Sequence, residues 1–212
     1  MIFRDRIEAG EALTKELQRY KNQEEVVIIG LPRGGVPVAY QVAENLNLPL
    51  DIVCPRKIGA PMNKEFAIGA ITETGEGIFD IETIARLHIT KEYIAEEVEN
   101  EKKEARYRLE IYREGRPPRN LKGKTIIIID DGLATGSTMK AAIQSIKAED
   151  AKKIVVAVPV SPPDTVEEIR SMVDEVICLD APLFFQAVGQ FYEDFSPTHD
   201  DEVVELMKIS RG

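Results

Sequence analysis

Short apolar runs alternate along this chain with segments whose apolar residues recur at helical spacing. The runs have the length of buried strands, and the segments between them have the length of helices. The runs that predict strands are VVIIG (residues 26–30), LPLDIVCP (48–55), TIIII (125–129), KIVVAVPV (153–160) and EVICLD (175–180). Because strand, helix and strand in succession form the unit of a parallel sheet, we predict a doubly wound α/β fold with a mainly parallel central sheet flanked by helices.

Two stretches depart from this succession. Between residues 56 and 80, glycines and prolines interrupt the pattern, and FAIGAIT and GIFDI remain as candidates for short hairpin strands. Residues 91–114 predict a long charged helix, whose acidic and basic side chains at i,i+4 spacing favour an exposed face. Binding to a partner or to a second copy is the alternative role for this helix. The length of 212 residues fits one α/β domain with appendages.

The acidic balance of the chain bears on its partners and its location. Aspartate and glutamate total 37 against 27 lysines and arginines, a formal net charge of −10, which opposes binding to nucleic acid or to an anionic membrane. No stretch reaches the roughly 18 to 20 apolar residues that span a membrane, and the charges in MIFRDRIEAGEAL argue against a signal peptide. We expect a cytoplasmic protein in which Cys54 and Cys178 are reduced core residues.

The strongest chemical signal follows the isoleucine strand. Asp130 and Asp131 come directly after it, and a loop of small residues then leads into a helix that Ser137 and Thr138 open. Ligands of open α/β sheets bind at the carboxyl ends of strands, and a helix start after a glycine-containing loop favours phosphate. Because carboxylates repel phosphate, the acidic pair suits sugar hydroxyls or a hydrated Mg²⁺ ion. The sequence therefore predicts a site for a sugar that carries phosphate.

The run TIIIIDDGLATGSTM (residues 125–139) closely resembles the 5-phosphoribosyl-1-pyrophosphate (PRPP) signature of type I phosphoribosyltransferases. The resemblance implies their fold: one domain over residues 1–212, a core at about residues 24–180, and a small variable hood built from N- and C-terminal segments. It implies Mg²⁺-dependent transfer of a phosphoribosyl group from PRPP to a nitrogen base, or the reverse pyrophosphorolysis. Asp130 and Asp131 would contact the ribose hydroxyls, and could assist PRPP in holding Mg²⁺. The 5-phosphate would lie against Ala134, Thr135, Gly136, Ser137 and Thr138.

A second anion-binding loop is predicted at GLPRGG (residues 30–35), after the first strand. Consecutive Gly34 and Gly35 let backbone amides approach an anion, and Arg33 supplies a permanent cation. A tight turn with an exposed arginine is the alternative. By resemblance to the family, Arg33, Gly34 and Gly35 bind the pyrophosphate of PRPP, and the Pro32–Arg33 peptide bond is expected to be cis.

Two further groups of residues receive roles by resemblance. Lys57 and, second to it, Arg56 follow the second strand and are expected to reach the pyrophosphate. The glycine- and proline-rich residues 59–63 behind them have the composition of a mobile lid. Phe184 and Phe185 lie in an aromatic tail and are candidates for stacking on the base in the hood, with packing of the tail onto the sheet as the alternative.

These motifs identify a donor and leave the acceptor base unnamed. A homodimer is common in the family, and the long charged helix is compatible with one. Two other functions stay open beside the enzyme: a non-catalytic regulator that binds PRPP or a nucleotide, and a stress-related component that acts with a hydrolase partner, since similar domains occur fused to hydrolases. A scan of bases for PRPP-dependent release of pyrophosphate separates the enzyme from the regulator.

Overall fold

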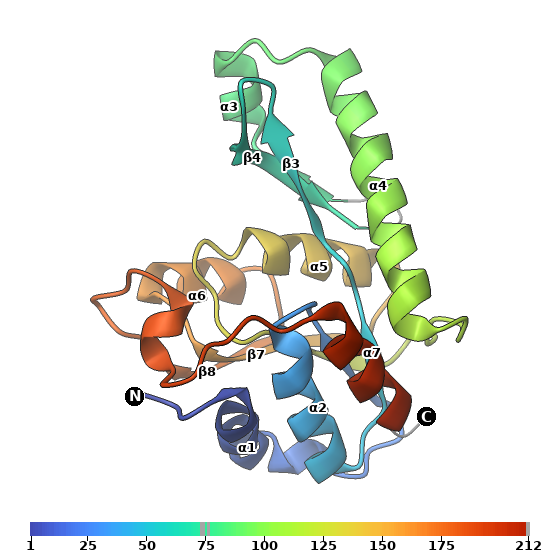
Figure 1. Cartoon of the computed structure of the whole chain (residues 1–212), viewed down its shortest axis with the longest axis vertical. Coiled ribbons are helices and arrows are strands. Elements are labelled where there is room, and N and C mark those ends of the chain that lie inside the picture. Colours follow the sequence, from blue (N-terminus) through green and yellow to red (C-terminus); the bar gives the residue numbers. More distant parts are fainter. Residues whose placement is uncertain (73–74, 76, 211–212) are drawn as a thin grey trace.

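The computed structural model describes residues 1–72, 75 and 77–210 of the chain. Within this described part, a five-stranded parallel sheet in the order β2-β1-β6-β7-β8 forms the centre of the body (Figure 1). The central strands β1 and β6 pair from Val26 opposite Thr125 to Gly30 opposite Ile129, and both are buried along their whole length, as their unbroken apolar runs predicted. The strands are β1 (Val26–Gly30), β2 (Leu50–Ile52), β6 (Thr125–Ile129), β7 (Lys153–Val160) and β8 (Glu175–Asp180).

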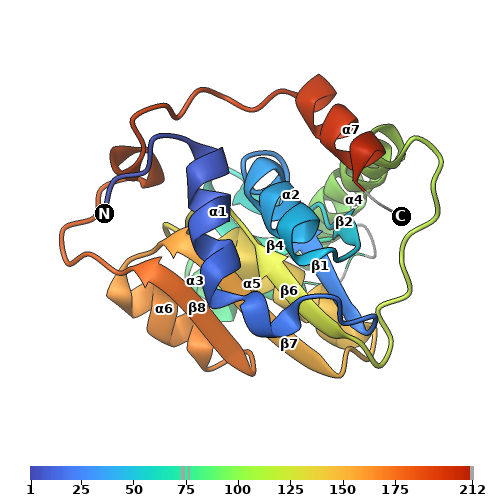
Figure 2. The same ribbon diagram turned by 90° about the horizontal axis from the view of Figure 1, so that it is seen from below.

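Helices cover both faces of this sheet, which confirms the doubly wound α/β fold (Figure 2). On one face lie α1, α2 and α7, and on the other lie α5 and α6. Helix α5 packs Met139, Ala142, Ile143 and Ile146 against the sheet, at the i, i+3, i+4, i+7 spacing of an amphipathic helix. The helical elements of the body are α1 (Arg6–Glu16), η1 (Gln18–Tyr20), α2 (Gly35–Leu46), α5 (Ser137–Ala148), α6 (Pro163–Arg170), η2 (Val188–Phe191) and α7 (Asp200–Ile209).

A second, antiparallel sheet lies on the α5 side of the body, against that helix (Figure 1). It consists, in the described residues, of β3 (Arg56–Ala60), β4 (Asn63–Ile71) and β5 (Gly77–Phe79), and α3 (Ile81–Arg86) follows it. The short strands expected at FAIGAIT and GIFDI are confirmed as parts of β4 and β5. Strand β3 was not predicted. The glycine- and proline-rich residues 59–63 form the end of the β3–β4 hairpin, with a turn at residues 61–62.

Helix α4 (Lys91–Arg113) confirms the predicted long charged helix and joins the second sheet to the body. Thr90 caps its start, because the side-chain oxygen accepts a hydrogen bond from the Tyr93 amide at 3.2 Å. The N-terminal half packs Tyr93 and Val98 against the second sheet, whereas the C-terminal half buries Leu109 and Tyr112 in the main core. One continuous helix therefore carries the second sheet.

Two expectations about the environment of the chain can be compared with the fold. None of the described helices is both long enough and apolar enough to cross a bilayer. Cys54 and Cys178 carry free thiols, the first buried and the second partly buried, as expected for reduced core residues. Burial raises the pKa of Cys178 to about 11, so its thiol is protonated at neutral pH.

Candidate functional site

The two predicted loops meet at the carboxyl ends of adjacent strands. Asp130 and Asp131 follow β6, and the glycine loop follows β1, its neighbour in the sheet. The contact leaves no room for side chains: a Cβ added to Gly34 would lie 2.0 Å from Asp131 Oδ2, and one added to Gly35 would lie 2.8 Å from Asp130 Cα. The two glycines are therefore required for the loop to lie against the acidic pair.

Arg33 lies at the open side of the glycine loop. The peptide bond between Pro32 and Arg33 is cis, as the resemblance to the family implied. The Arg33 side chain is 45% exposed, and its Nη1 lies 3.8 Å from Asp200 Oδ1 at the start of α7. Such an exposed, long-range pair contributes little to stability, so the guanidinium can exchange this partner for an anionic ligand.

Asp131 is held by an arginine that the sequence analysis did not single out. Arg6, in the first turn of α1, contacts Asp131 Oδ2 through Nε at 2.9 Å and Nη2 at 2.8 Å, and both side chains are 13% exposed. The guanidinium also donates to the Ser196 carbonyl at 2.8 Å and lies 4.1 Å from the centre of the Phe195 ring. Burial raises the pKa of Asp131, and the charge and hydrogen bond of Arg6 act against this rise.

Asp130 precedes Asp131 directly after β6, and both acids are partly buried. Its Oδ1 accepts a hydrogen bond from the Asp131 amide at 2.9 Å. Burial first, and then the charge of Asp131, raise the pKa of Asp130 well above its ordinary value. A perturbed carboxyl pair at a strand end is a frequent property of functional sites.

The predicted 5-phosphate loop joins β6 to α5. Gly136 takes a left-handed conformation with φ of 69°, and α5 begins at Ser137, where it was predicted to begin. Thr165 from α6 donates a hydrogen bond to the Ala134 carbonyl at 2.8 Å and fixes the loop from behind. Ala134 and Thr135 are exposed, and Thr135 Oγ1 lies 3.0 Å from Ser137 Oγ. Hydroxyls and backbone amides at the start of a helix are suited to an anion.

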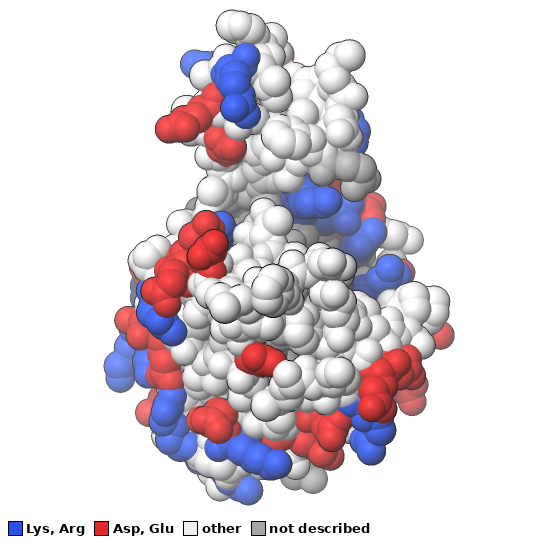
Figure 3. All heavy atoms as spheres, turned by 90° about the vertical axis from the view of Figure 1, so that its left-hand side faces the viewer, with Lys and Arg blue, Asp and Glu red and all other residues white. Residues whose placement is uncertain are grey.

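The second sheet lies over the start of α5. A cavity of about 260 Å³ separates the two, and it is lined by Ala67, Ile68, Gly69, Ala70, Ile78, Phe79, Asp80, Ser137 and Lys140. In the space-filling view the molecule narrows between the second sheet and the body, and lysine and arginine side chains gather beside this waist (Figure 3). Acidic side chains lie near the opposite side of the waist in the same view (Figure 3).

Arg56 and Lys57 lie on the second sheet. Both belong to β3, where the backbone of Arg56 is opposite Ile71 and that of Lys57 opposite Ala70. The Arg56 guanidinium is engaged with α4, with Nε at 2.7 Å from Glu101 Oε2. The Lys57 side chain is exposed. Because both residues belong to the second sheet, whether either one can reach pyrophosphate at the glycine loop depends on where that sheet lies relative to the body.

The N-terminal segment and the segment after β8, from which the hood was expected, lie beside the acidic pair, since Arg6 and Tyr192 both contact Asp131. The Phe184 side chain is 95% exposed, and Phe185 stacks on Phe191 with ring centres 5.4 Å apart. Tyr192 is the aromatic residue that contacts the signature, because its hydroxyl donates to the Asp131 carbonyl at 2.6 Å. The local concentration of aromatic residues in the tail pointed to this region, whereas nothing in the sequence singled out Arg6.

The acidic pair can be tested as a place for Mg²⁺. Its carboxylate oxygens are the ligand type that this cation prefers, but Asp131 Oδ2 is occupied by Arg6 and Asp130 Oδ1 by a backbone amide. In the described part of the chain no group of three or more histidine, cysteine, aspartate or glutamate side chains could hold a metal ion. The residues therefore fit an ion whose ligands come mainly from a bound phosphate ester, with the remaining oxygens of Asp130 and Asp131 as additional ligands.

Comparisons with known proteins identify the family of this chain. The family model described as phosphoribosyl transferase domain matches residues 3–196. A candidate phosphoribosyl transferase of Mycobacterium tuberculosis is 42% identical over 206 residues, which make up 97% of this chain and 46% of that protein, so the chain spans about half the length of this relative. The crystal structure of TT1426 from Thermus thermophilus is 40% identical, with 100% of both chains covered and a TM-score of 0.86. The chain therefore belongs to the phosphoribosyl transferase domain family.

Proposed function

We propose that this protein transfers the 5-phosphoribosyl group of PRPP to a nitrogen base, or catalyses the reverse pyrophosphorolysis. The observation that carries the proposal is the contact between the glycine loop and the acidic pair, where Gly34 has no space for a Cβ beside Asp131. This contact brings two anion-binding elements, with two carboxyl groups between them, to one edge of the sheet. A ligand with phosphate at both ends of a sugar matches that order of groups.

Each part of the site then has a role in the proposed reaction. Asp130 and Asp131 orient the ribose hydroxyls and favour the positive charge that develops at the anomeric carbon. Residues 134–138 bind the 5-phosphate, which supplies binding energy far from the reacting bond. Arg33 and the amides of the glycine loop receive the leaving pyrophosphate, with Lys57 and Arg56 as further candidates. Bound Mg²⁺ supplies additional charge neutralisation for the leaving group.

The acceptor base would bind under the hood. Tyr192 and Phe195 lie next to the acidic pair, whereas Phe184 is exposed at a distance from the packed ring cluster. We therefore add Phe195 to the earlier candidates Phe184 and Phe185 for stacking on the base. We expect the reaction to take place in the cytoplasm, with a homodimer as the candidate assembly.

A scan of acceptor bases tests the proposal. Purine and pyrimidine bases, with orotate among them, are each mixed with the protein, PRPP and Mg²⁺, and the release of pyrophosphate is measured together with the nucleotide formed. We expect one base or one class of bases to give pyrophosphate and nucleotide in equal amounts. Binding of PRPP without release in the presence of any base would contradict the enzyme and favour the non-catalytic regulator.

A double variant tests the assignment of the acidic pair. Replacing Asp130 and Asp131 by asparagine should weaken PRPP binding at least about tenfold, because hydrogen bonds to charged acceptors contribute roughly 1.5 kcal/mol or more. Asp150→Asn is a matched control, since Asp150 is an exposed acid with its side chain 72% accessible. Unchanged PRPP affinity in a folded double variant would refute the ribose assignment.

A further inference from the structure

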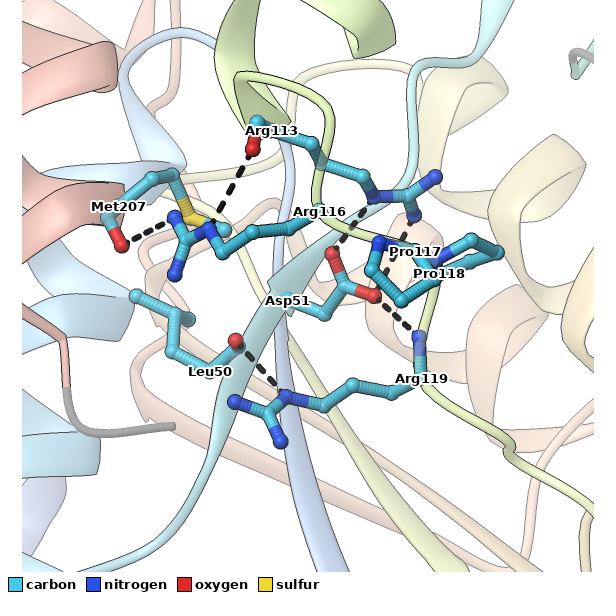
Figure 4. Close-up of a pocket in the computed structure, with 8 residues that line it drawn as sticks. All are labelled: Leu50, Asp51, Arg113, Arg116, Pro117, Pro118, Arg119 and Met207. Atoms are coloured by element: carbon cyan, nitrogen blue, oxygen red, sulfur yellow. Dashed lines mark hydrogen bonds and ion pairs between the residues drawn. The ribbon is translucent and has the colours of Figure 1, made fainter.

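A second polar pocket lies at the edge of the main sheet, outside the predicted PRPP site. It forms where α4 ends and the chain turns back toward β6, beside the edge strand β2 and the last turns of α7 (Figure 4). Its volume is about 350 Å³, within the range of sites for small molecules. The residues that line it are Leu50, Asp51, Arg113, Arg116, Pro117, Pro118, Arg119 and Met207.

Both carboxylate oxygens of Asp51, the acid among the residues that line this pocket, already have partners in the protein. Asp51 is 5% exposed, and Arg113 pairs with both of its oxygens, from Nε to Oδ1 at 3.0 Å and from Nη2 to Oδ2 at 3.3 Å. The Arg119 amide donates to Oδ2 at 3.0 Å as well. Asp51 therefore neutralises Arg113 and holds the loop in place, and it has little capacity left for another cation.

Two further arginines are left without a carboxylate partner in the described part of the chain. Arg116 donates from Nε to the Arg113 carbonyl at 3.3 Å and from Nη2 to the Met207 carbonyl, and Arg119 donates from Nε to the Leu50 carbonyl at 3.2 Å. These acceptors are neutral, and each guanidinium keeps other N–H donors available. The pocket thus carries an excess of two positive charges in a chain whose net charge is −10.

The arrangement of these groups indicates the kind of ligand. The guanidinium groups of Arg116 and Arg119 lie on the same side of Asp51, next to Leu50 and Met207 (Figure 4). The forked N–H donors of an arginine guanidinium group match phosphate oxygens in geometry and charge. The rings of Pro117 and Pro118, on the other side of Asp51, add an apolar wall. We propose that this pocket binds a phosphorylated small molecule with an apolar or planar body, the chemistry of a nucleotide.

The pocket is also connected to the predicted pyrophosphate loop through α7. Arg116 holds the Met207 carbonyl near the end of this helix, and Asp200 at its start pairs with Arg33. Lys208 fixes the same end of α7 to Glu114, with Nζ at 2.8 Å from Oε1. A ligand that engages Arg116 therefore acts on the helix whose other end contacts Arg33, which makes the pocket suited to regulation of that loop.

Arginine-specific chemical modification tests the proposal residue by residue. Phenylglyoxal is applied to the whole protein with and without ADP, and the modification of each arginine is followed by mass spectrometry. We expect ADP at ten times its Kd to slow modification of Arg116 and Arg119 about tenfold, because only the unliganded fraction reacts. Arg170 is the control, since its exposed side chain pairs only with Glu167 on the same helix at 2.6 Å.

The same experiment separates this pocket from the proposed PRPP site, because protection of Arg33 reports on that site independently. Unchanged modification of Arg116 and Arg119, or an equal slowing at Arg170, would overturn the proposal whatever happens at Arg33. In a titration with ADP, replacing Arg116 and Arg119 by glutamine should weaken binding at the pocket at least about tenfold, whereas Arg170→Gln should have no effect. If the glutamine variant does not fold, the modification pattern of the unmodified chain still decides.

Discussion

At the residue scale, Asp130 is a carboxyl group whose surroundings disfavour its charged form. Burial and the charge of Asp131 raise its pKa well above the ordinary value. An acid whose pKa is higher in the folded chain than in the unfolded chain stabilises the fold below its unfolded pKa, near pH 4. That contribution is lost as the pH rises through the folded-state pKa. As the pH rises from mildly acidic to neutral, ionisation of Asp130 should therefore lower the free energy of unfolding of the unliganded protein.

The variant Asp130→Asn should be more stable than the natural chain at neutral pH and should bind PRPP more weakly. The asparagine amide cannot ionise, so a buried charge no longer reduces the free energy of unfolding. Each increase of 1 kcal/mol in that free energy raises the Tm by about 2 to 4 °C in a domain of this size. Thermal unfolding at pH 5 and pH 7 measures the effect, which should be larger at pH 7. The exposed Asp150→Asn should change neither property. A lower Tm at pH 7 would show that the Asp130 charge stabilises the empty site.

At the scale of elements, the pattern of apolar residues predicted the strands of the body and parts of β4 and β5, but it did not predict β3. The unbroken runs of β1 and β6 and the amphipathic spacing of α5 have local causes that a sequence displays. Strand β3 is short, begins with the charged Arg56 and Lys57 and contains Gly59. It forms because the next strand, β4, pairs with it and because α4, about 35 residues later in the sequence, supports it, and such tertiary contacts leave no periodic signal.

Polar contacts that include the following three attach the described part of the hairpin to α4, which should limit its independent motion. Tyr93 Oη donates to the Gly59 carbonyl at 2.8 Å, and the other two are the Arg56–Glu101 pair at 2.7 Å and the Lys64–Glu97 pair at 2.5 Å. A lid built in this way would close together with α4 rather than as a free loop.

The variant Tyr93→Phe tests this attachment. Losing one hydrogen bond of about 1 kcal/mol should speed amide hydrogen exchange in residues 57–64 about fivefold, without unfolding the body. Tyr107→Phe is the matched control on the same helix, because Tyr107 is 60% exposed, and it should leave exchange in the hairpin unchanged. Equal exchange in the natural chain and in Tyr93→Phe would mean that the hydrogen bond does not restrain the hairpin.

At the scale of the whole molecule, the N-terminal segment meets the segment that follows β8 beside the candidate site. The Phe3 amide donates to the Phe191 carbonyl at 2.8 Å, and the Glu193 amide donates to the Phe3 carbonyl at 2.8 Å. The sequence showed the donor half of the site because Asp130 and its loop are contiguous. It did not show Arg6, which lies 125 positions before its partner Asp131, because an ion pair over such a separation depends on the complete fold.

Arg6 should therefore connect the stability of the whole molecule to the candidate site. Replacing it by alanine leaves Asp131 with little exposure and no cation beside it, which should reduce the free energy of unfolding by about 2 to 3 kcal/mol and the Tm by about 4 to 12 °C. Because Arg6 opposes the rise in the pKa of Asp131, the loss should be smaller at pH 5, where more of Asp131 is protonated, than at pH 8. Arg4→Ala removes a neighbouring arginine that is 64% exposed and paired only at the surface, and it should leave the Tm unchanged. Equal effects of the two substitutions would refute a stabilising role for Arg6. A loss that does not grow with pH would place its role in packing against Phe195 instead of in its charge.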